Sequence, residues 1–568
     1  MGGRVIGVTL VVASFHRLDL RAAKGRQCAE SFRCSPTRAR EGGGASAHSG
    51  LHVPNVLRVA NPRLSDLRDA PPWERWLDEP QSGLVCFAGW TLATAVFIGL
   101  IALFGGPGQP DAAESLYATW AIAHGSFACA YPPATSHASN FFLFYAPGPG
   151  TPPLWPLFSG ALAGLTHVGH TVPFPTQQAL GANCTDAYDA MYHWAQGSVA
   201  IFPTIGLGYF SWFFLLAGVV SVLRASGRGR SGWEFFGMIF IALVPIVWEP
   251  LLLVYHPQDL VCIGLSLAAT ACAIRREWLW AGVLVGLAIS SQQFALLVLA
   301  PLVVVAPGKD RWKLLGSSAV VVAVLSFPFI VATSGRAIHS VLLGTGDSVT
   351  QGGTILWETG LRGAALVFFS RVVPILVGLA IAWLGLRRLG PKVREPLPLV
   401  SLVATSLSMR IVFEEGLYGY KFMALAVMLT ILAIVEGRIR GQLVAWLALV
   451  TLAFNPIPNS HAINARLWGT HAAAALPLVF LVIALALIVY DAAHRRLRWY
   501  LIAWIVIAAC IVLQWPPWSL NSLRAQLPLW LLQLLLLPTG VAMAAGPLVR
   551  SIRATEPTPR TNADRVTL

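Results

Sequence analysis

Residues 83–105 read GLVCFAGWTLATAVFIGLIALFG, an apolar stretch without a single charged side chain. A helix needs about 20 apolar residues to cross the hydrocarbon core of a bilayer, and this stretch has that length. Lipid offers the backbone no hydrogen-bond partner, so a stretch of this kind must be helical. Similar stretches recur as far as Val549. The sequence therefore predicts an all-α, polytopic integral membrane protein with about 12 to 14 membrane-embedded helices.

The composition leads to the same class of protein. Charged residues make up 12% of the 568 residues and hydrophobic residues 56%, whereas soluble domains carry about 25% charged residues. The net charge of +14 comes from short basic clusters between the apolar stretches. A nucleic-acid site needs a basic face with polar or aromatic readers, so the pattern argues against nucleic acid as a partner and indicates orientation signals in a lipid bilayer.

These basic clusters predict the topology, because cytoplasmic loops of membrane proteins carry an excess of Lys and Arg. Residues 107–198 contain neither, and we expect them to form a long first extracytoplasmic loop in which residues 154–168 are a re-entrant or surface helix. The later clusters alternate with loops that lack them. We therefore expect a multi-pass protein of the cell (plasma) membrane, with both termini cytoplasmic.

The chain divides by composition into four parts. Residues 1–72 are a basic tail, which we interpret as disordered and cytoplasmic, or in part as lying upstream of the true start. Residues 73–440 form the main transmembrane module, and residues 441–549 supply further transmembrane helices. Residues 550–568 are expected to be a cytoplasmic tail.

One apolar stretch is interrupted by polar residues. Basic clusters on both sides of residues 278–306 require this stretch to enter the membrane and return on the same side. Its length is short for two complete crossings. Two half-helices that meet at Ser290, Ser291, Gln292 and Gln293 fit better, because a polar apex is tolerated only where protein or a cavity surrounds it.

Two acidic residues open the long loop. Asp111 and Glu114 follow Pro110 in residues 111–126, which we expect to be helical, with both acids in the first turn. They either cap the helix or present a carboxylate base at the membrane surface. The sequence leaves both interpretations open.

The segment around Pro257 also has two interpretations. Pro257 and Asp259 are typical of a capped turn between two helices, but such a turn does not account for His256 and Gln258. These side chains therefore belong either to the turn or to a site at the extracytoplasmic face. Arg371 lies deep within its predicted helix, and we expect its side chain to turn inward.

A third polar group lies at the predicted outer end of another helix. Arg410 and Glu414 are spaced for an ion pair on one helix face. Tyr418, Tyr420 and Lys421 follow directly. The group is either a structural ion pair or an anion-recognition site, and its concentration of charge and tyrosine favours recognition.

The eight cysteines show no pattern of metal ligands. Cys129 and Cys184 both fall in the predicted extracytoplasmic loop, where oxidation is allowed, so they either form a disulfide or remain two unpaired thiols. Cysteines within apolar stretches are expected to be packing residues, and these are Cys86, Cys262, Cys272 and Cys510.

The early acids with Tyr117, the turn of residues 256–259, and the segment AGVLVGLA at residues 281–288 together resemble the GT-C superfamily of membrane glycosyltransferases. Within it, the chain is most similar to glycosyltransferase family 87, the polyprenyl-phosphate-mannose-dependent α-mannosyltransferases of actinobacteria. The likeness covers residues 83–440. Ala113 occupies a position, four residues before Tyr117, at which many members carry an acid, so the choice of base between Asp111 and Glu114 stays open.

The resemblance implies a hexosyltransferase that moves a sugar, mannose above others, from a polyprenyl phosphate to a hydroxyl of a glycolipid, glycan or protein. It implies that Asp111, with Glu114 second, acts as the base on the extracytoplasmic side. The remaining residues would bind the donor phosphate or sugar, and they are His256, Gln258, Asp259, Gln292, Gln293, Arg410, Glu414, Tyr418, Tyr420 and Lys421. No cofactor and no metal site is expected, and whether the reaction needs a metal ion stays open.

Three other functions compete with this interpretation. A transporter or lipid-glycan flippase would place its polar groups near the midplane and often shows repeats, which the sequence lacks. A non-catalytic scaffold or degenerate transferase would explain the displaced acid. A ligase that transfers whole polymers between lipid and acceptor is the third.

Overall fold

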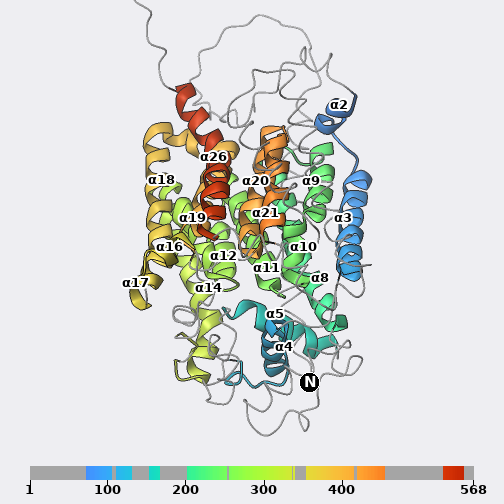
Figure 1. Cartoon of the computed structure of the whole chain (residues 1–568), viewed down its shortest axis with the longest axis vertical. Coiled ribbons are helices and arrows are strands. Elements are labelled where there is room, and N and C mark those ends of the chain that lie inside the picture. The colour runs from blue at the N-terminus through green and yellow to red at the C-terminus, as the bar shows by residue number, and fades with distance from the viewer. Residues whose placement is uncertain are drawn as a thin grey trace, which may run out of the picture. The chain divides into compact units, whose positions relative to one another are not determined.

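The computed structural model describes residues 72–104, 110–130, 152–166, 201–252, 255–335, 337–338, 354–361, 363–414, 419–454 and 529–555. Within these ranges the chain is helical and forms no strand, apart from an isolated bridge between Pro80 and Ser231 (Figure 1). Six helices are long and apolar enough to cross a membrane, and five shorter apolar helices accompany them. The predicted class, an all-α membrane protein, is confirmed for the described residues. The predicted crossings between residues 455 and 528 lie outside them, as does most of the N-terminal tail.

The helices are, in chain order, α2 (Pro72–Asp78), α3 (Gly83–Phe104), α4 (Pro110–Ala123), α5 (Leu154–Thr166), α8 (Ile201–Ala225), α9 (Gly232–Leu243), α10 (Pro245–Leu252), α11 (Pro257–Ile274), α12 (Trp278–Ile289), the 3₁₀ turn η3 (Gln293–Ala295), α13 (Leu296–Val305), α14 (Asp310–Ala332), α16 (Ile355–Glu358), α17 (Gly363–Val367), the π turn η4 (Phe368–Val372), α18 (Val373–Leu389), the 3₁₀ turn η5 (Gly390–Arg394), α19 (Pro396–Val412), the 3₁₀ turn η6 (Gly419–Phe422), α20 (Met423–Glu436), α21 (Gly441–Phe454) and α26 (Leu529–Thr555).

Helix α11 is the central helix of the described fold. It is 94% buried, and it packs between α8 and α12 with further contacts to α19 and α5. Its sequence has no charged residue between Asp259 in the first turn and Arg275 after the last. Pro257 at the first helical position suits the start of a helix because its missing N–H would have no partner there. A helix this deeply buried fixes the positions of the residues at both of its ends.

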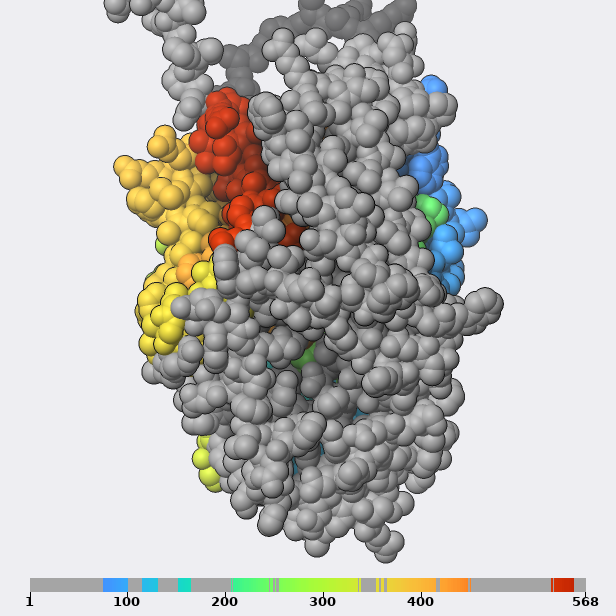
Figure 2. All heavy atoms as spheres, in the orientation of Figure 1, coloured from blue at the N-terminus to red at the C-terminus, as the bar shows by residue number. Residues whose placement is uncertain are grey.

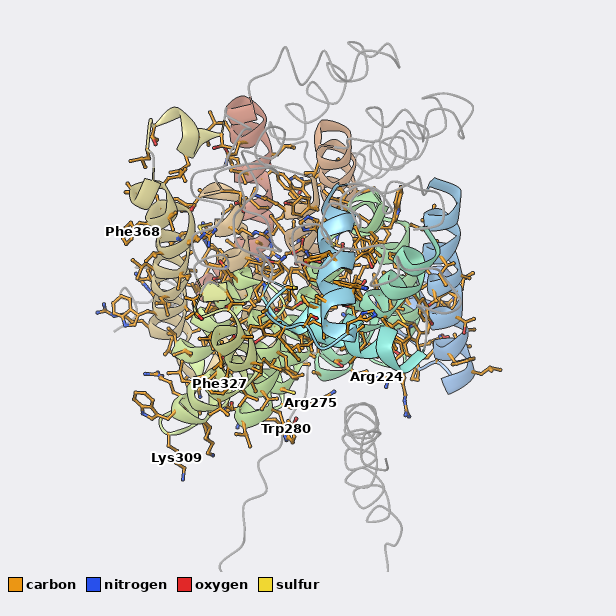
Figure 3. All side chains as sticks on the ribbon, turned by 90° about the horizontal axis from the view of Figure 1, so that it is seen from below. Arg224, Arg275, Trp280, Lys309, Phe327 and Phe368 are labelled. Atoms are coloured by element: carbon orange, nitrogen blue, oxygen red, sulfur yellow. The ribbon has the colours of Figure 1, made fainter. Side chains whose placement is uncertain are left out.

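Helices α3, α14 and α18 lie at the periphery. Only 17% of α14 is buried, and its outward side chains include Val320, Val324 and Phe327. Seen from below, the labelled Trp280 and Phe368 lie at the edge of the helices (Figure 3), and both are exposed. In the face of Figure 2, α18 and α26 are next to each other at the left. Such exposed apolar side chains suit contact with lipid tails.

The interrupted stretch forms two short helices, as predicted. Helix α12 ends at Ile289, the backbone is extended at Gln292, and η3 and α13 follow. We call residues 290–293 the apex. The glycines of the segment AGVLVGLA pack α12 tightly on α14, because a Cβ on Gly282 or Gly286 would meet the α14 backbone. This part of the sequence therefore serves helix packing.

Helices α4 and α5 lie side by side at the lower end of Figure 1. The predicted helix that carries the early acids is confirmed as α4, with Pro110 at its start. The Thr119 and Ser159 hydroxyls are 2.7 Å apart, and Trp155 Nε1 donates to Ser115 Oγ at 3.2 Å. With 13 residues, α5 is about 20 Å long and too short to cross a bilayer, as expected.

Basic residues from several loops gather at one end of the helices. Arg228 pairs with Asp78 of α2 and donates to the carbonyl of Val435 at the end of α20. Arg394 donates to the carbonyl of Val305 at the end of α13. Loops that the positive-inside rule predicts to share one side of the membrane therefore meet at one end, which we call the basic end.

The contact between α8 and α11 depends on two facing glycines. A Cβ on either Gly218 or Gly264 would clash with the backbone of the other helix. We expect Gly264→Ala to destabilise the protein by about 1–3 kcal/mol, because the helices must separate. Gly316→Ala is the matched control, since Gly316 lies on α14 with open space around it. Thermal unfolding in detergent would measure both, and an equal effect of the two substitutions would contradict this packing.

Candidate functional site

Polar side chains from four segments come together at the end of the helices opposite the basic end. The segments are the start of α11, the apex, η4, and the end of α19 with η6. Helix α11 has 18 residues, which separates its two ends by about 27 Å. We call the following residues the polar cluster: His256, Gln258, Asp259, Ser291, Gln293, Arg371, Arg410, Glu414, Tyr420 and Lys421.

The turn before α11 holds an imidazole against a carboxylate. His256 Nδ1 is 3.5 Å from Asp259 Oδ2 and 3.3 Å from Gln258 Nε2. Gln258 Oε1 has no hydrogen-bond partner among the described residues. A half-turn of the Gln258 amide would place this oxygen on Nδ1, which would then donate a proton. The turn can therefore hold His256 as a neutral ring or as an imidazolium that faces Asp259.

Asp259 is a buried acid with few partners. Its residue is 1% exposed, and neither carboxylate oxygen accepts a hydrogen bond from a described residue. Withdrawing a carboxylate from water costs several kcal/mol unless charges and hydrogen bonds compensate. The His256 ring lies 3.5 Å from it, and the N-terminus of α11, in whose first turn Asp259 lies, also favours a negative charge there. Both carboxylate oxygens of Asp259 are therefore available to accept a hydrogen bond from a ligand or to take up a proton.

Tyr255, directly before this turn, has a strained backbone. Its φ is +48°, a region that bulky residues rarely adopt. Its side chain is 2% exposed, and its hydroxyl has no partner among the described residues. Burial raises the pKa of Tyr255, so the phenol keeps its proton. Strain of this kind occurs at functional sites, and no local pattern in the sequence predicts it.

The apex connects the turn to two arginines. Ser291 Oγ donates to the carbonyl of Gln258 at 2.8 Å. Arg371 Nη1 donates to Gln293 Oε1 at 3.0 Å, so its predicted inward orientation is confirmed. Arg371 lies in the π turn η4, a type of turn that is frequent at functional sites. Arg410 stacks its guanidinium on the Phe294 ring, 4.2 Å from the centroid.

Glu414 bridges the two remaining cations. It accepts from Arg410 Nε at 3.2 Å and from Lys421 Nζ at 2.9 Å. Burial would raise the pKa of Glu414, but the attraction of Lys421 and Arg410 outweighs it and lowers this pKa below its usual value. Tyr420 stacks on His256 with ring centroids 4.3 Å apart. This stack closes a circuit of contacts from His256 through the apex to Lys421.

The structure thus brings together most of the residues that the sequence predicted for a site. Gln292 adjoins them, and its carbonyl accepts from Cys262 Sγ at 3.7 Å. The predicted ion pair of Arg410 and Glu414 is confirmed. The sequence did not single out Tyr255 or Phe294, although each is a direct neighbour of a predicted residue.

Three of the predicted site residues have side chains that the structure does not describe. Asp111 and Glu114 belong to the first turn of α4, but their side chains are not described, and neither is Tyr418. Helix α4 nevertheless packs on α5, whose Leu154 N–H donates to the Ser290 carbonyl of the apex at 2.7 Å. The helix that carries the two acids is therefore linked to the apex through one intermediate helix.

The cysteines divide as the sequence indicated. Cys86, Cys262 and Cys272 are free and buried, as expected of packing residues. Cys129 is disulfide-bonded, and Cys184 lies outside the described residues, so their pairing stays a prediction. Among the described residues, no three His, Cys, Asp or Glu side chains form a group that could hold a metal ion.

The fold and the polar cluster define an all-α membrane protein with a charged site at one end of its helices. Comparison of the chain with protein-family models, with curated proteins and with solved structures finds no match.

Removal of the bridging acid tests the electrostatics of the polar cluster. We expect Glu414→Gln to destabilise the protein at pH 7 by about 2 kcal/mol, because Arg410 and Lys421 lose a common partner. The pKa of Glu414 is lowered by folding, so its contribution is complete above the ordinary value of 4.5 and is lost as the pH falls through the lower, folded value.

Thermal unfolding in detergent between pH 7 and pH 3 would measure this effect. The difference between wild type and Glu414→Gln should shrink once the pH falls below about 4.5. Glu79→Gln, at an exposed position, is the control and should leave the curve unchanged. A difference that is constant over this pH range would rule out the charged bridge.

Proposed function

We propose that this protein is a membrane glycosyltransferase that moves a sugar from a polyprenyl phosphate to a hydroxyl of a glycolipid, glycan or protein on the extracytoplasmic side. Mannose is the sugar that the resemblance to glycosyltransferase family 87 implies. The observation that carries the proposal is the polar cluster, in which cations and acids from four segments meet at the end opposite the basic end. A lipid-linked donor fits this place, because its polyprenyl tail stays in the bilayer while its phosphate enters the cluster.

The charges of the polar cluster suit a phosphate. Arg371, Arg410 and Lys421 face two acids, Asp259 and Glu414, so the cluster keeps one positive charge in excess even when His256 is neutral. Arg371 Nη1 donates to the amide oxygen of Gln293, which places its guanidinium beside the apex, and an arginine fork matches phosphate oxygens in geometry. Glu414 holds Arg410 and Lys421 at fixed distances, which prepares them for an anion.

The reaction needs one base and a stabilised leaving group. A carboxylate takes the proton of the acceptor hydroxyl, and the hydroxyl oxygen attacks the anomeric carbon of the sugar. The bond between this carbon and the phosphate oxygen breaks, and its electron pair leaves with the polyprenyl phosphate. Cations placed at this oxygen stabilise the transition state more than the ground state, because the negative charge develops there.

Asp111 and Glu114 are the proposed bases, with Asp111 first. They lie at the start of α4, and α4 is linked through α5 to the apex. Asp259 is less suited to meet a bulky acceptor because it is 1% exposed. Its part would be to hold His256 in a charged, oriented form toward the donor phosphate, while Tyr420 supports the ring from its face.

The base is tested by two substitutions in membranes that contain the protein. We expect Asp111→Asn to abolish transfer from a radiolabelled polyprenyl-phosphate mannose, since the hydroxyl would keep its proton, with expression unchanged. Glu114→Gln is the matched change one turn further along the same helix. Full activity of both variants would exclude these acids as bases.

The phosphate site is tested separately. We expect Arg371→Gln to reduce the rate of transfer by about 10²-fold, in the range found when one stabilising donor is removed from a transition state. Arg387→Gln is the control, because Arg387 lies at the far end of the same helical stretch, where it covers Trp383. The same radiolabel assay measures both, and equal rates would contradict a role for Arg371 in leaving-group stabilisation.

One observation favours a second candidate, a lipid-glycan flippase or transporter. The apex joins two short helices, α12 with 12 residues and α13 with 10, each shorter than the about 20 residues that cross a bilayer. Broken helices of this kind form the substrate sites of many transporters.

An experiment in proteoliposomes with a fluorescent polyprenyl-phosphate sugar distinguishes the transporter from the transferase. Movement of the lipid between leaflets without transfer to an acceptor would favour this candidate over the transferase.

A further inference from the structure

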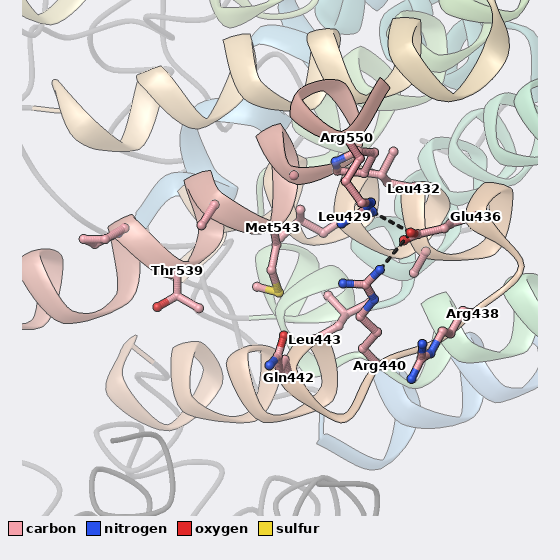
Figure 4. A pocket seen from close by; sticks show the side chains of 15 residues that line it. Leu429, Leu432, Glu436, Arg438, Arg440, Gln442, Leu443, Thr539, Met543 and Arg550 are labelled. Atoms are coloured by element: carbon pink, nitrogen blue, oxygen red, sulfur yellow. Dashed lines mark hydrogen bonds and ion pairs between the residues drawn. The ribbon is translucent and has the colours of Figure 1, made fainter. Parts of the chain in front are cut away.

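A separate cavity lies at the basic end, far from the polar cluster. It occupies about 490 Å³ between α20, α21 and α26 (Figure 4), a volume within the usual range for small-molecule sites. Charged side chains lie at one end of it, where Arg550 and Arg440 converge on Glu436, and apolar side chains line much of the rest. The proposed transferase reaction uses none of these residues.

The charged end carries an excess of positive charge. Glu436 accepts from Arg440 Nη2 at 2.8 Å and from Arg550 Nη2 at 2.5 Å. Arg438 also lines the cavity, and Arg440 and Arg550 share the one carboxylate of Glu436, so this pair by itself keeps one positive charge in excess. Arg440 Nε is buried and has no hydrogen-bond partner among the described residues. A second anion would complete the coordination of these arginines.

The pKa of Arg440 supports this account of the charges. Burial lowers this pKa most, Glu436 opposes the decrease, and the neighbouring Arg550 and Arg438 lower it further. The direction therefore mainly reflects a guanidinium withdrawn from water, with two further cations close by. An anion next to Arg440 would relieve the repulsion among the three arginines.

The rest of the cavity follows one face of α26. Its lining residues on this helix recur every three or four positions, which places them in one stripe, and they are Pro538, Thr539, Ala542, Met543, Gly546, Pro547 and Arg550. The stripe extends about 16 Å from Arg550 to Thr539. Leu429 and Leu432 of α20 and Leu443 of α21 form the facing wall. The small side chains at 542 and 546 leave room for an elongated apolar group.

We propose that this cavity binds an anionic phospholipid, with the phosphate at Arg440 and Arg550 and the first part of an acyl chain along the stripe on α26. The combination of a cationic end and an apolar stripe matches the two chemical halves of such a lipid. A free phosphate would leave the stripe unused, and a zwitterionic lipid would leave the excess charge unbalanced. Basic pockets between transmembrane helices on the cytoplasmic side are suited to anionic headgroups.

The bound lipid would connect α26 to α20 and α21. Its phosphate would contact Arg440, which directly precedes α21, and Arg550 on α26. Glu436 holds the same two arginines when the lipid is absent, so the phosphate must compete with this carboxylate. Because of this competition, removal of the Glu436 carboxylate should strengthen lipid binding, an effect that a purely structural ion pair would not show.

The test uses the full chain in detergent and measures binding of short-chain phosphatidylglycerol by native mass spectrometry. We expect Arg550→Gln to weaken binding about fivefold, the effect of one basic residue on an anionic lipid. Arg553→Gln is the matched control, since it removes the same charge from the same helix at an exposed position outside the cavity, and it should change binding less than about twofold.

Glu436→Gln should strengthen binding, because the competing carboxylate is gone, whereas any variant that merely damaged the fold would weaken it. Short-chain phosphatidylcholine and inorganic phosphate serve as the two comparison ligands, and we expect both to bind more weakly than phosphatidylglycerol. Equal binding of phosphatidylcholine, equal binding of inorganic phosphate, an equal effect of Arg553→Gln, or weaker binding by Glu436→Gln would each overturn the proposal.

Discussion

Backbone that leaves a helix inside a membrane must find its hydrogen bonds within the protein, and the apex between α12 and α13 finds them on α5 and α11. The carbonyl of Ser290 receives the N–H of Leu154, and the carbonyl of Gln292 receives the thiol of Cys262. The hydroxyl of Ser291 turns to the carbonyl of Gln258. Helix α5 and the first half of α11 are thus held against the apex. The other two segments of the polar cluster join it through Arg371, which donates to Gln293, and through Arg410, which stacks on the neighbouring Phe294.

The charged side chains of the described residues form two groups, one at each end of the helices. Arginines of the loops gather at the basic end, where Asp78, Glu234 and Glu436 balance part of their charge. At the other end, Glu414 balances Arg410 and Lys421, and Asp259 faces His256. The central helix α11 carries no charge in between. Each end can therefore bind an anion of its own, and the two proposed sites differ in what else they offer. The polar cluster offers acids and aromatic rings, and the cavity at the basic end offers an apolar stripe.

The sequence predicted what depends on local patterns. The two half-helices followed from four polar residues within an apolar stretch, and the common end of the basic loops followed from their alternation. The pair of Arg410 and Glu414 followed from helical spacing.

Contacts between distant segments could not be predicted from the sequence, because no local pattern relates Arg371 to Gln293 or Tyr420 to His256. The backbone strain at Tyr255 and the π turn that presents Arg371 depend on tertiary packing in the same way. Arg438 and Arg440 were interpreted only as orientation signals, since the cavity that they line exists only once α20, α21 and α26 are packed.

The contact of α12 with α14 couples the apex to the surrounding lipid. Helix α14 is mostly exposed, so its tilt responds to the thickness of the hydrocarbon layer. Gly282 and Gly286 bring α12 against the backbone of α14 at Leu314 and Ser318, so the two helices are in close contact there. A tilt of α14 is thus passed to α12, and through it to the residues that orient Gln258, Arg371 and Arg410. Bilayers of different acyl-chain length would therefore set the polar cluster to slightly different geometries.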